Sequence, residues 1–215
     1  MSVRVGIVDS GINPDHPHVG QVTGGVFFFA EGESPDFVDR IGHGTAVAGV
    51  IREKAPAAEL YAVRIFDRRL TANIDTLMRG LDWCLRHRIH VVNLSIGTAN
   101  ERHRPRFEDF LRRAHWQGVF VVSAASMLPG MLEGAIGVDT DEECDRGNCR
   151  FRNGTFLASP YPRPIPGVPQ EFNLHGISFA IANCTGLLVR VMEAYPPADA
   201  YREFLARAVN SGSDG

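Results

Sequence analysis

Residues 42–49 read Gly-His-Gly-Thr-Ala-Val-Ala-Gly, which places His43 between two glycines at the start of an apolar helical segment. Glycines on both sides of a histidine let another stretch of backbone approach it closely. The apolar pattern predicts a helix over residues 44–54 and then a buried strand over residues 60–66.

The same alternation continues in both directions along the chain. We expect further strands at residues 3–8, 26–29, 91–96, 119–124 and 135–138, and helices at residues 74–86, 107–117, 177–192 and 198–209. Short, fully apolar strands that alternate with helices indicate a parallel sheet covered on both faces. We therefore predict one domain, residues 1–215, folded as a three-layer α/β sandwich around a mainly parallel sheet.

The pattern breaks between residues 139 and 173. Residues 151–157 fit a hairpin with Asn153-Gly154 at its turn, because this dipeptide favours a tight connection between strands. Residues 160–169 contain too many prolines for an interior strand, so we expect a loop there. This loop and the last helix are candidate contact surfaces, with an ordinary surface role as the alternative.

Composition narrows the classes of partner. The chain of 215 residues has a formal net charge of −3 and is 44% hydrophobic, as is usual for a soluble globular protein. Charge gives no indication of a nucleic-acid partner, and no apolar run reaches the roughly 18 residues of a membrane span. Met1 leads directly into strand-like residues 3–8 with no leader pattern, so we expect a cytoplasmic protein.

The four cysteines do not have the paired spacing of a metal site. Cys144 and Cys149 flank a turn-like stretch, where they would be either a small disulfide loop or two free thiols, the state expected in the cytosol. Cys84 and Cys184 lie in apolar helical patterns and are expected in the core.

Three polar residues stand out by their positions. Asp9 ends the strand of residues 3–8, His43 starts a helix, and Ser178 opens another. Each has an ordinary alternative, as a turn aspartate, a buried histidine or an N-cap serine. In the chain order Asp, His, Ser they supply an orienting carboxylate, a base and a nucleophile, which is a known order of the serine hydrolase triad.

The segments around these residues resemble those of the subtilases, the subtilisin-like serine proteases, over most of the chain. Residues 3–11 resemble the family's Asp strand, residues 42–49 its His helix and residues 176–186 its Ser helix. Residues 91–97, Val-Val-Asn-Leu-Ser-Ile-Gly, resemble the strand that pairs with an extended substrate.

The resemblance implies a minimal subtilisin-like fold and a serine endopeptidase that acts on a peptide or protein. It implies a catalytic triad formed by Asp9, His43 and Ser178. It also implies a substrate-binding edge formed by Ser95, Ile96 and Gly97. Extended peptides bind such edges through main-chain hydrogen bonds. The missing leader motivates the further expectation that the substrate is one dedicated peptide that is matured by cleavage.

The chain departs from the family in the region of the oxyanion hole. The family's asparagine donor aligns with Met127, whose thioether cannot donate a hydrogen bond. Loss of one such donor costs about 10²–10³ in turnover, a scale known from subtilisin. Ser126, Asn100 or a backbone N–H are the candidate substitutes. The segment that walls the family's specificity pocket is reduced to residues 128–134, so no preferred cleavage residue is predicted.

No metal or cofactor is expected. The family's calcium loop is absent from the His helix, because residues 47–53 pass directly to Ala55-Pro56, and no other stretch has the spaced carboxylates of a calcium loop.

Two other functions remain open at this point. Met127 and the shortened pocket also fit a pseudoprotease that binds a peptide in its groove without cleaving it. The same triad would also serve a serine esterase or transacylase. Oligomeric state is not indicated by the sequence.

Overall fold

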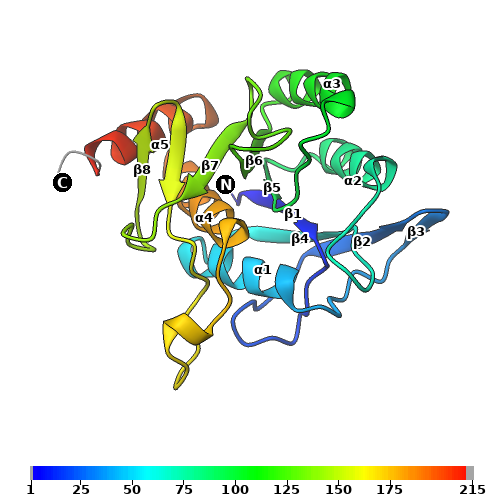
Figure 1. The fold of residues 1–215 in the computed structure, drawn as a ribbon, viewed down its shortest axis with the longest axis horizontal. Helices are drawn as coiled ribbons and strands as arrows, with labels where there is room; N and C mark the ends of the chain where they lie inside the picture. Colours follow the sequence, from blue (N-terminus) through cyan, green and yellow to red (C-terminus); the bar gives the residue numbers. More distant parts are fainter. Residues whose placement is uncertain (1, 212–215) are drawn as a thin grey trace.

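Nine strands are present in residues 2–211, the part of the chain that the computed structural model describes: β1 (Arg4–Asp9), β2 (Gly24–Phe29), β3 (Gly32–Ser34), β4 (Glu59–Arg64), β5 (Val91–Leu94), β6 (Phe120–Ala124), β7 (Ile136–Thr140), β8 (Cys149–Arg152) and β9 (Thr155–Ala158). They form one sheet in the order β3-β2-β4-β1-β5-β6-β7-β9-β8 (Figure 1). Only β3 on β2 and β8 on β9 pair antiparallel. The prediction of a mainly parallel sheet is confirmed.

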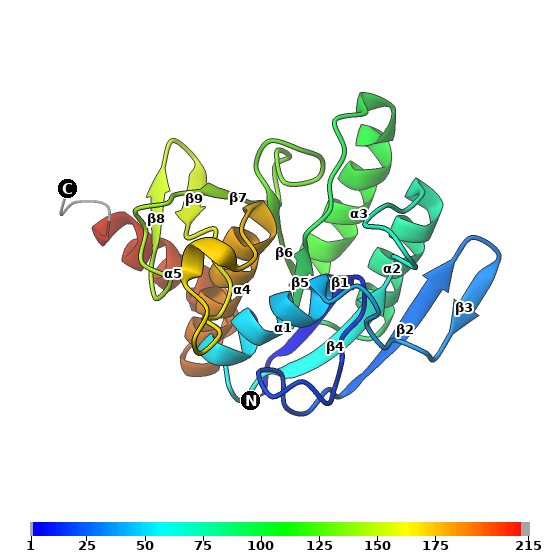
Figure 2. The same cartoon turned by 60° about the horizontal axis from the view of Figure 1, so that its bottom comes forward.

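Helices cover both faces of this sheet. Their bounds are α1 (His43–Lys54), α2 (Ile74–Arg86), α3 (Arg104–Trp116), α4 (Ile177–Ala194) and α5 (Pro197–Asn210), with short 3-10 turns η1 (Glu101–His103) and η2 (Gln170–Phe172). Helices α1, α4 and α5 pack on one face, and α2 and α3 pack on the other (Figures 1 and 2). The three-layer α/β architecture is therefore confirmed.

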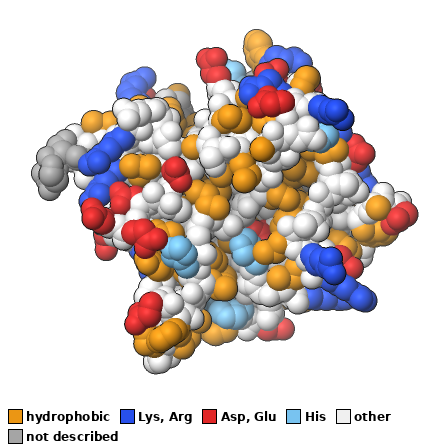
Figure 3. Space-filling model, in the orientation of Figure 1, with side chains coloured by type: hydrophobic (Ala, Val, Ile, Leu, Met, Phe, Trp, Pro, Cys, Tyr) orange, Lys and Arg blue, Asp and Glu red, His pale blue; other side chains and the backbone are white. Residues whose placement is uncertain are grey.

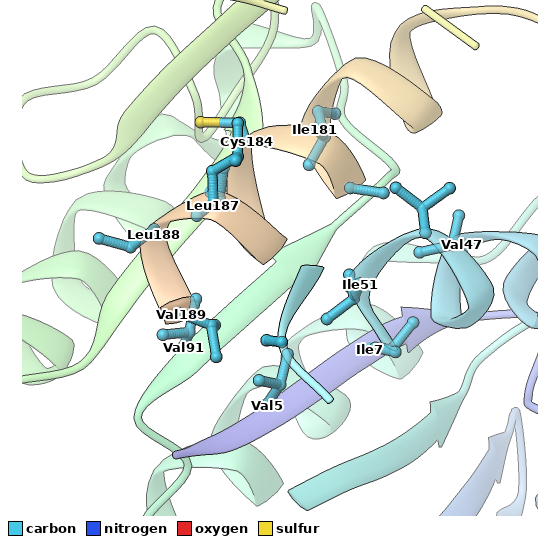
Figure 4. Close-up of a cluster of buried hydrophobic side chains, with 14 of the residues drawn as sticks. Val5, Ile7, Val47, Ile51, Val91, Ile181, Cys184, Leu187, Leu188 and Val189 are labelled. Carbon is cyan, nitrogen blue, oxygen red and sulfur yellow. The ribbon is translucent and has the colours of Figure 1, made fainter. Parts of the chain in front are cut away.

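The larger core lies between the sheet and the pair α1 and α4. Val5 and Ile7 of β1 meet Val47 and Ile51 of α1, and all four are fully buried (Figure 4). Burial of one such side chain stabilises the fold by about 1.5–3 kcal/mol, so this contact holds α1 firmly against the strand that ends at Asp9.

Helix α4 corrects the expectation that no segment has the length and composition of a membrane span, because it meets both criteria. Its 18 residues have a mean hydropathy of 1.3, but 67% of them are buried inside the fold. A helix covered by α1, α5 and the sheet in this way has the environment of a core helix.

All four cysteines are free and buried, so Cys144 and Cys149 do not form the disulfide that was one of the two alternatives. Burial raises the pKa of every one of these thiols, that of Cys149 to about 12. Because the thiolate is the reactive form of cysteine, these thiols are expected to be unreactive.

The predicted hairpin is confirmed, with Asn153 at φ 51° and Gly154 at φ 84° in the turn between β8 and β9. Strand β9 also pairs with β7 in parallel and so extends the main sheet, which the sequence did not indicate. The strand expected over residues 91–96 ends at Leu94, and α3 begins at Arg104 rather than at residue 107.

Protonation of His90 is expected to lower the stability of the fold in acid, because His90 is hydrogen-bonded to Arg4 at the start of β1. The backbone N–H of Arg4 donates to His90 Nδ1 at 3.0 Å, which requires this nitrogen to be unprotonated. Burial and then the charge of Arg4 lower the pKa of His90 below its usual 6.5. A folded-state pKa below the unfolded one means that stability is complete above pH 6.5 and declines as the pH falls below it.

We therefore expect wild type to lose more stability between about pH 7.5 and about pH 5.5 than His90→Asn does. Urea unfolding of both proteins at the two pH values measures this difference. An equal loss in the two proteins would show that His90 does not contribute, since the other histidines are common to both.

Candidate active site

Asp9 and His43 come together at the carboxyl end of the sheet. Asp9 is the last residue of β1 and is fully buried, and His43 is the first residue of α1. Nδ1 of His43 lies 2.7 Å from Oδ1 of Asp9. A carboxylate can only accept, so Nδ1 carries the proton and Nε2 is left unprotonated in the neutral ring. This is the arrangement that a catalytic base requires.

Two residues that sequence reasoning missed fix the start of α1. Asp39 Oδ1 accepts from the N–H groups of Ile41 and Gly42, and Asp39 Oδ2 accepts from the N–H and the hydroxyl of Thr45. Ser10 Oγ accepts from the N–H of Gly44 at 2.9 Å. The available signal was an aspartate shortly before a helix start, the usual position of a capping residue.

The glycine after His43 is required by a close backbone approach. A Cβ at Gly44 would lie 2.2 Å from the carbonyl oxygen of Gly11 and 3.2 Å from the Cβ of Asp9. At Gly42 the reason differs, since its surroundings are open and its φ is 95°. Close packing of α1 on the end of β1 therefore needs Gly44, and the turn into α1 needs Gly42.

The environment of His43 favours the charged imidazolium. Burial alone would lower the pKa of His43, but the hydrogen bond to Asp9 and the charges of Asp9 and Asp39 outweigh it and raise the pKa above its usual 6.5. Oδ2 of Asp9 is buried and has no hydrogen-bond partner in the described part of the chain, so His43 is the main group that compensates this carboxylate.

The raised pKa of His43 predicts the acid limb of any activity that uses it as a base. A base must be unprotonated, so kcat/KM is expected to fall as the pH is lowered through a midpoint above 6.5. The measurement is a pH profile of kcat/KM, with circular dichroism over the same range as the control for folding. A midpoint at or below 6.5 would contradict the assignment.

Ser178 lies at the start of α4, the helix whose Phe179 ring contacts His43. It is the second residue of α4 and is half-buried. The ring of the next residue, Phe179, has its centroid 5.7 Å from that of His43. Within residues 2–211, Ser178 Oγ forms no hydrogen bond with Nε2 of His43, and such contacts often tighten only when substrate is present.

The start of α4 has a backbone N–H that is suited to receive an anion. The N–H groups of Phe179 and Ala180 bind the carbonyl of Gly176, whereas the N–H of Ser178 belongs to the first helical turn, which has no acceptors within the helix. An N–H at a helix start is well suited to bind a developing negative charge.

The residues proposed for the second donor have different surroundings. Asn100 caps η1 through its side chain and also lies 3.4 Å from His103, so its amide is engaged there. The backbone N–H of Met127 binds the carbonyl of Ala124, and its side chain is 41% exposed. Ser126 is exposed, and its hydroxyl is the candidate for the second hydrogen-bond donor to the oxyanion.

The predicted substrate edge follows β5. Ser95, Ile96 and Gly97 are half-buried and lie beyond the ladder of β5, which ends at Leu94. Beyond them, Thr98 and Leu128 exchange two backbone hydrogen bonds, and this bridge explains why the strand ends earlier than expected. Buried Asn93 anchors the segment by donating to Ser95 Oγ and accepting from Thr185 of α4.

Comparison with known proteins identifies the family. Residues 1–126, more than half of the chain, match the Subtilase family. The chain is a subtilase. The thermostable alkaline protease of Halalkalibacterium halodurans is 32% identical over 217 residues, which cover 90% of this chain and 57% of that protease. This subtilase thus spans little more than half the length of that relative.

Two solved structures share the fold of this subtilase. A cold-adapted subtilisin-like serine proteinase superposes with a TM-score of 0.74 at 18% identity, covering 95% of this chain and 81% of that one. A lanthipeptide protease superposes with a TM-score of 0.68 at 19% identity, covering 90% and 74%. These structures confirm the subtilisin-like architecture predicted from the sequence.

Proposed function

We propose that the chain is a serine endopeptidase in which Ser178 attacks a peptide carbonyl. His43 Nε2 takes the hydroxyl proton as the bond to carbon forms, and Asp9 stabilises the resulting imidazolium. The N–H of Ser178 binds the developing oxyanion. His43 then gives the proton to the leaving amine, and a water that His43 deprotonates hydrolyses the acyl-enzyme.

The observation that carries this proposal is the 2.7 Å contact between buried Asp9 and His43 beside the start of α4. A buried carboxylate held against an imidazole has an ordinary structural alternative, a satisfied core pair. Two features favour catalysis: Nε2 stays free of a protein partner among the described residues, and α4, which packs against α1, has a serine in its first turn.

We propose a dedicated peptide as the substrate, processed in the cytoplasm. The support for a peptide is the segment of residues 95–97, which lies beyond the ladder of β5 where an extended peptide could pair with it. The structural neighbour that is a lanthipeptide protease supports a peptide-processing role by analogy of fold. Four free, buried cysteines fit a reducing compartment.

A fluorophosphonate probe tests the proposed chemistry directly, because it modifies only an activated serine. We expect one equivalent to attach to Ser178, as located by peptide mapping, and no attachment to unfolded wild type or to His43→Ala. Absence of labelling in well-folded wild type would reject the endopeptidase and leave the binding-module alternative, which Met127 favours.

Replacement of Met127 by asparagine distinguishes a slow enzyme from a binding module. An amide at this position is expected to supply the donor that the thioether lacks and to raise kcat by about 10²–10³. Met127→Leu is the matched control, because it keeps the apolar shape and adds no donor. Equal turnover in both variants would show that position 127 does not face the oxyanion.

A further inference from the structure

A cavity of about 290 Å³ adjoins the candidate active site on the side of α1. Its walls come from the first turns of α1, the loop after β1, and the loop of residues 160–176 that leads into α4. Gly42, the residue before α1, and Thr45 in the first turn of α1 are wall residues on either side of His43 in the chain. Leu174, another wall residue, lies four residues before Ser178.

The position of the cavity indicates that it faces the part of a bound peptide that follows the scissile bond. The acyl half is proposed to pair with residues 95–97, which follow β5 and lead toward α3 on the other side of the sheet. His43 delivers its proton to the leaving amine, so the leaving half must pass over His43 and the start of α1. This path passes Gly42 and Thr45, which line the cavity, and the inference therefore rests on the proposed function.

Three basic side chains line this cavity, among polar neighbours that also include Asn13, Asp39, Thr45 and Asn173. His16, His18 and Arg163 line it, and histidines lie on the face of Figure 3 that carries α1 and the loop before α4. Within residues 2–211, Arg163 has no ion pair, and its recorded contact is from Nη1 to the carbonyl of His18 at 3.4 Å. A cation that is left without a carboxylate at a cavity wall is suited to bind an anion.

The one acidic wall residue does not neutralise this charge by direct pairing. Both oxygens of Asp39 are already occupied by four donors from residues 41–45. Burial, and then the charges of Arg163 and His16, lower the pKa of His18. The charged form of His18 is therefore disfavoured in the empty cavity, and a bound anion would favour it.

The rest of the lining accommodates a hydrocarbon stem. Ala46, Ile165 and Leu174 contribute apolar walls, and the last two are 46% and 50% exposed. We propose that this cavity binds a carboxylate on the leaving side of the scissile bond, held by Arg163 with His16 and His18. The carboxylate belongs either to a glutamate or aspartate side chain or to the free C-terminus of the substrate peptide.

Fluorogenic peptides measure this preference. In a series of alanine-based peptides, glutamate occupies in turn each of the first four positions after the scissile bond. A matching series carries glutamine at the same positions. Every peptide is made both with a free C-terminal carboxylate and with a C-terminal amide. At one position, wild type is expected to prefer glutamate by about tenfold or more in kcat/KM. If the free C-terminus is the ligand, kcat/KM is instead higher for the peptide with a free C-terminal carboxylate than for the C-terminal amide, at one peptide length.

Variants of Arg163 assign the preference to this cavity. Arg163→Gln is expected to bring the ratio close to one, and Arg163→Lys, which keeps the charge, to retain part of it. Arg152→Gln is the matched control, because it removes the same charge from exposed β8 and should leave the ratio unchanged. Urea unfolding confirms that each variant is folded.

Binding without catalysis separates this inference from the proposed function. The probes are three peptides: Ala-Leu-Glu-Ala and Ala-Leu-Gln-Ala with amidated C-termini, and Ala-Leu-Gln-Ala with a free C-terminal carboxylate. Each is added to wild type and to Arg163→Gln, and NMR follows the ring protons of His16 and His18. A carboxylate in the cavity raises the pKa of both histidines in wild type only.

If the fluorophosphonate labels Ser178 but no peptide shows a carboxylate preference or moves these histidines, the cavity is not the site and the protease remains. If labelling fails and the glutamate peptide or the free acid still shifts both histidines, the chain binds peptides without cleaving them, and the cavity assignment holds.

Discussion

Ser178→Ala is expected to lower kcat for peptide hydrolysis by on the order of 10⁶-fold, the scale known for the same change in subtilisin. The reason is chemical, because alanine leaves His43 with no hydroxyl to deprotonate and no acyl-enzyme can form. KM should change little, since the side chain of Ser178 is small and half-buried. Steady-state kinetics on a fluorogenic peptide give both constants.

Ser211→Ala is the matched control for this change. It removes a hydroxyl at the end of α5 that donates to the carbonyl of Arg207, so activity should be unchanged. If Ser178→Ala kept more than about a tenth of wild-type turnover, the nucleophile would be another residue. Loss of activity together with loss of the urea unfolding transition would instead indicate a folding defect.

The fold was predictable because its strands have an unambiguous pattern. The residues of β1 and β5 are almost all buried, and the runs of apolar residues that form them have no helical alternative of sufficient length. The hairpin was predictable for a similar reason, since Asn153 and Gly154 both tolerate the positive φ that its turn requires.

Two details of otherwise predicted elements were missed, the pairing of β9 with β7 and the start of α3. Strand β9 has only four residues and joins the sheet through β7, from which it is separated by an irregular segment and by β8. Helix α3 starts early because Pro105 fits the first helical turn, where its missing N–H has no cost.

The candidate site was predictable only in part. Asp9 and His43 were found because strand end and helix start are defined positions on an α/β sheet. The four bonds of Asp39 were not, because their donors become convergent only when residues 39–45 fold into a turn. The cavity beside α1 was equally invisible, since its basic residues come from two loops that are distant in the chain.

Asp9→Asn is expected to lower kcat by about 10⁴-fold while the protein stays folded. In wild type, Oδ1 of Asp9 accepts from both the N–H of Ser10 and Nδ1 of His43. An asparagine that keeps both bonds must place its NH₂ where Oδ2 now lies, a buried position without a recorded partner. The opposite rotamer directs the NH₂ at Ser10 and His43, which drives the imidazole proton to Nε2 and blocks it as a base.

Asp39→Asn is the comparison for this prediction, because it removes a second negative charge that also raises the pKa of His43. The NH₂ of the new residue cannot accept two of the four bonds that Asp39 accepts, so circular dichroism checks that α1 is intact. We expect a far smaller loss of kcat in Asp39→Asn than in Asp9→Asn, and a lower midpoint for the acid limb in both variants, since each loses a charge that favours the imidazolium. Comparable, modest losses in the two variants would mean that Asp9 acts only through its charge. A large loss confined to Asp9→Asn would locate the effect in the proton that Asp9 holds on Nδ1, and thus in the tautomer that lets His43 activate Ser178.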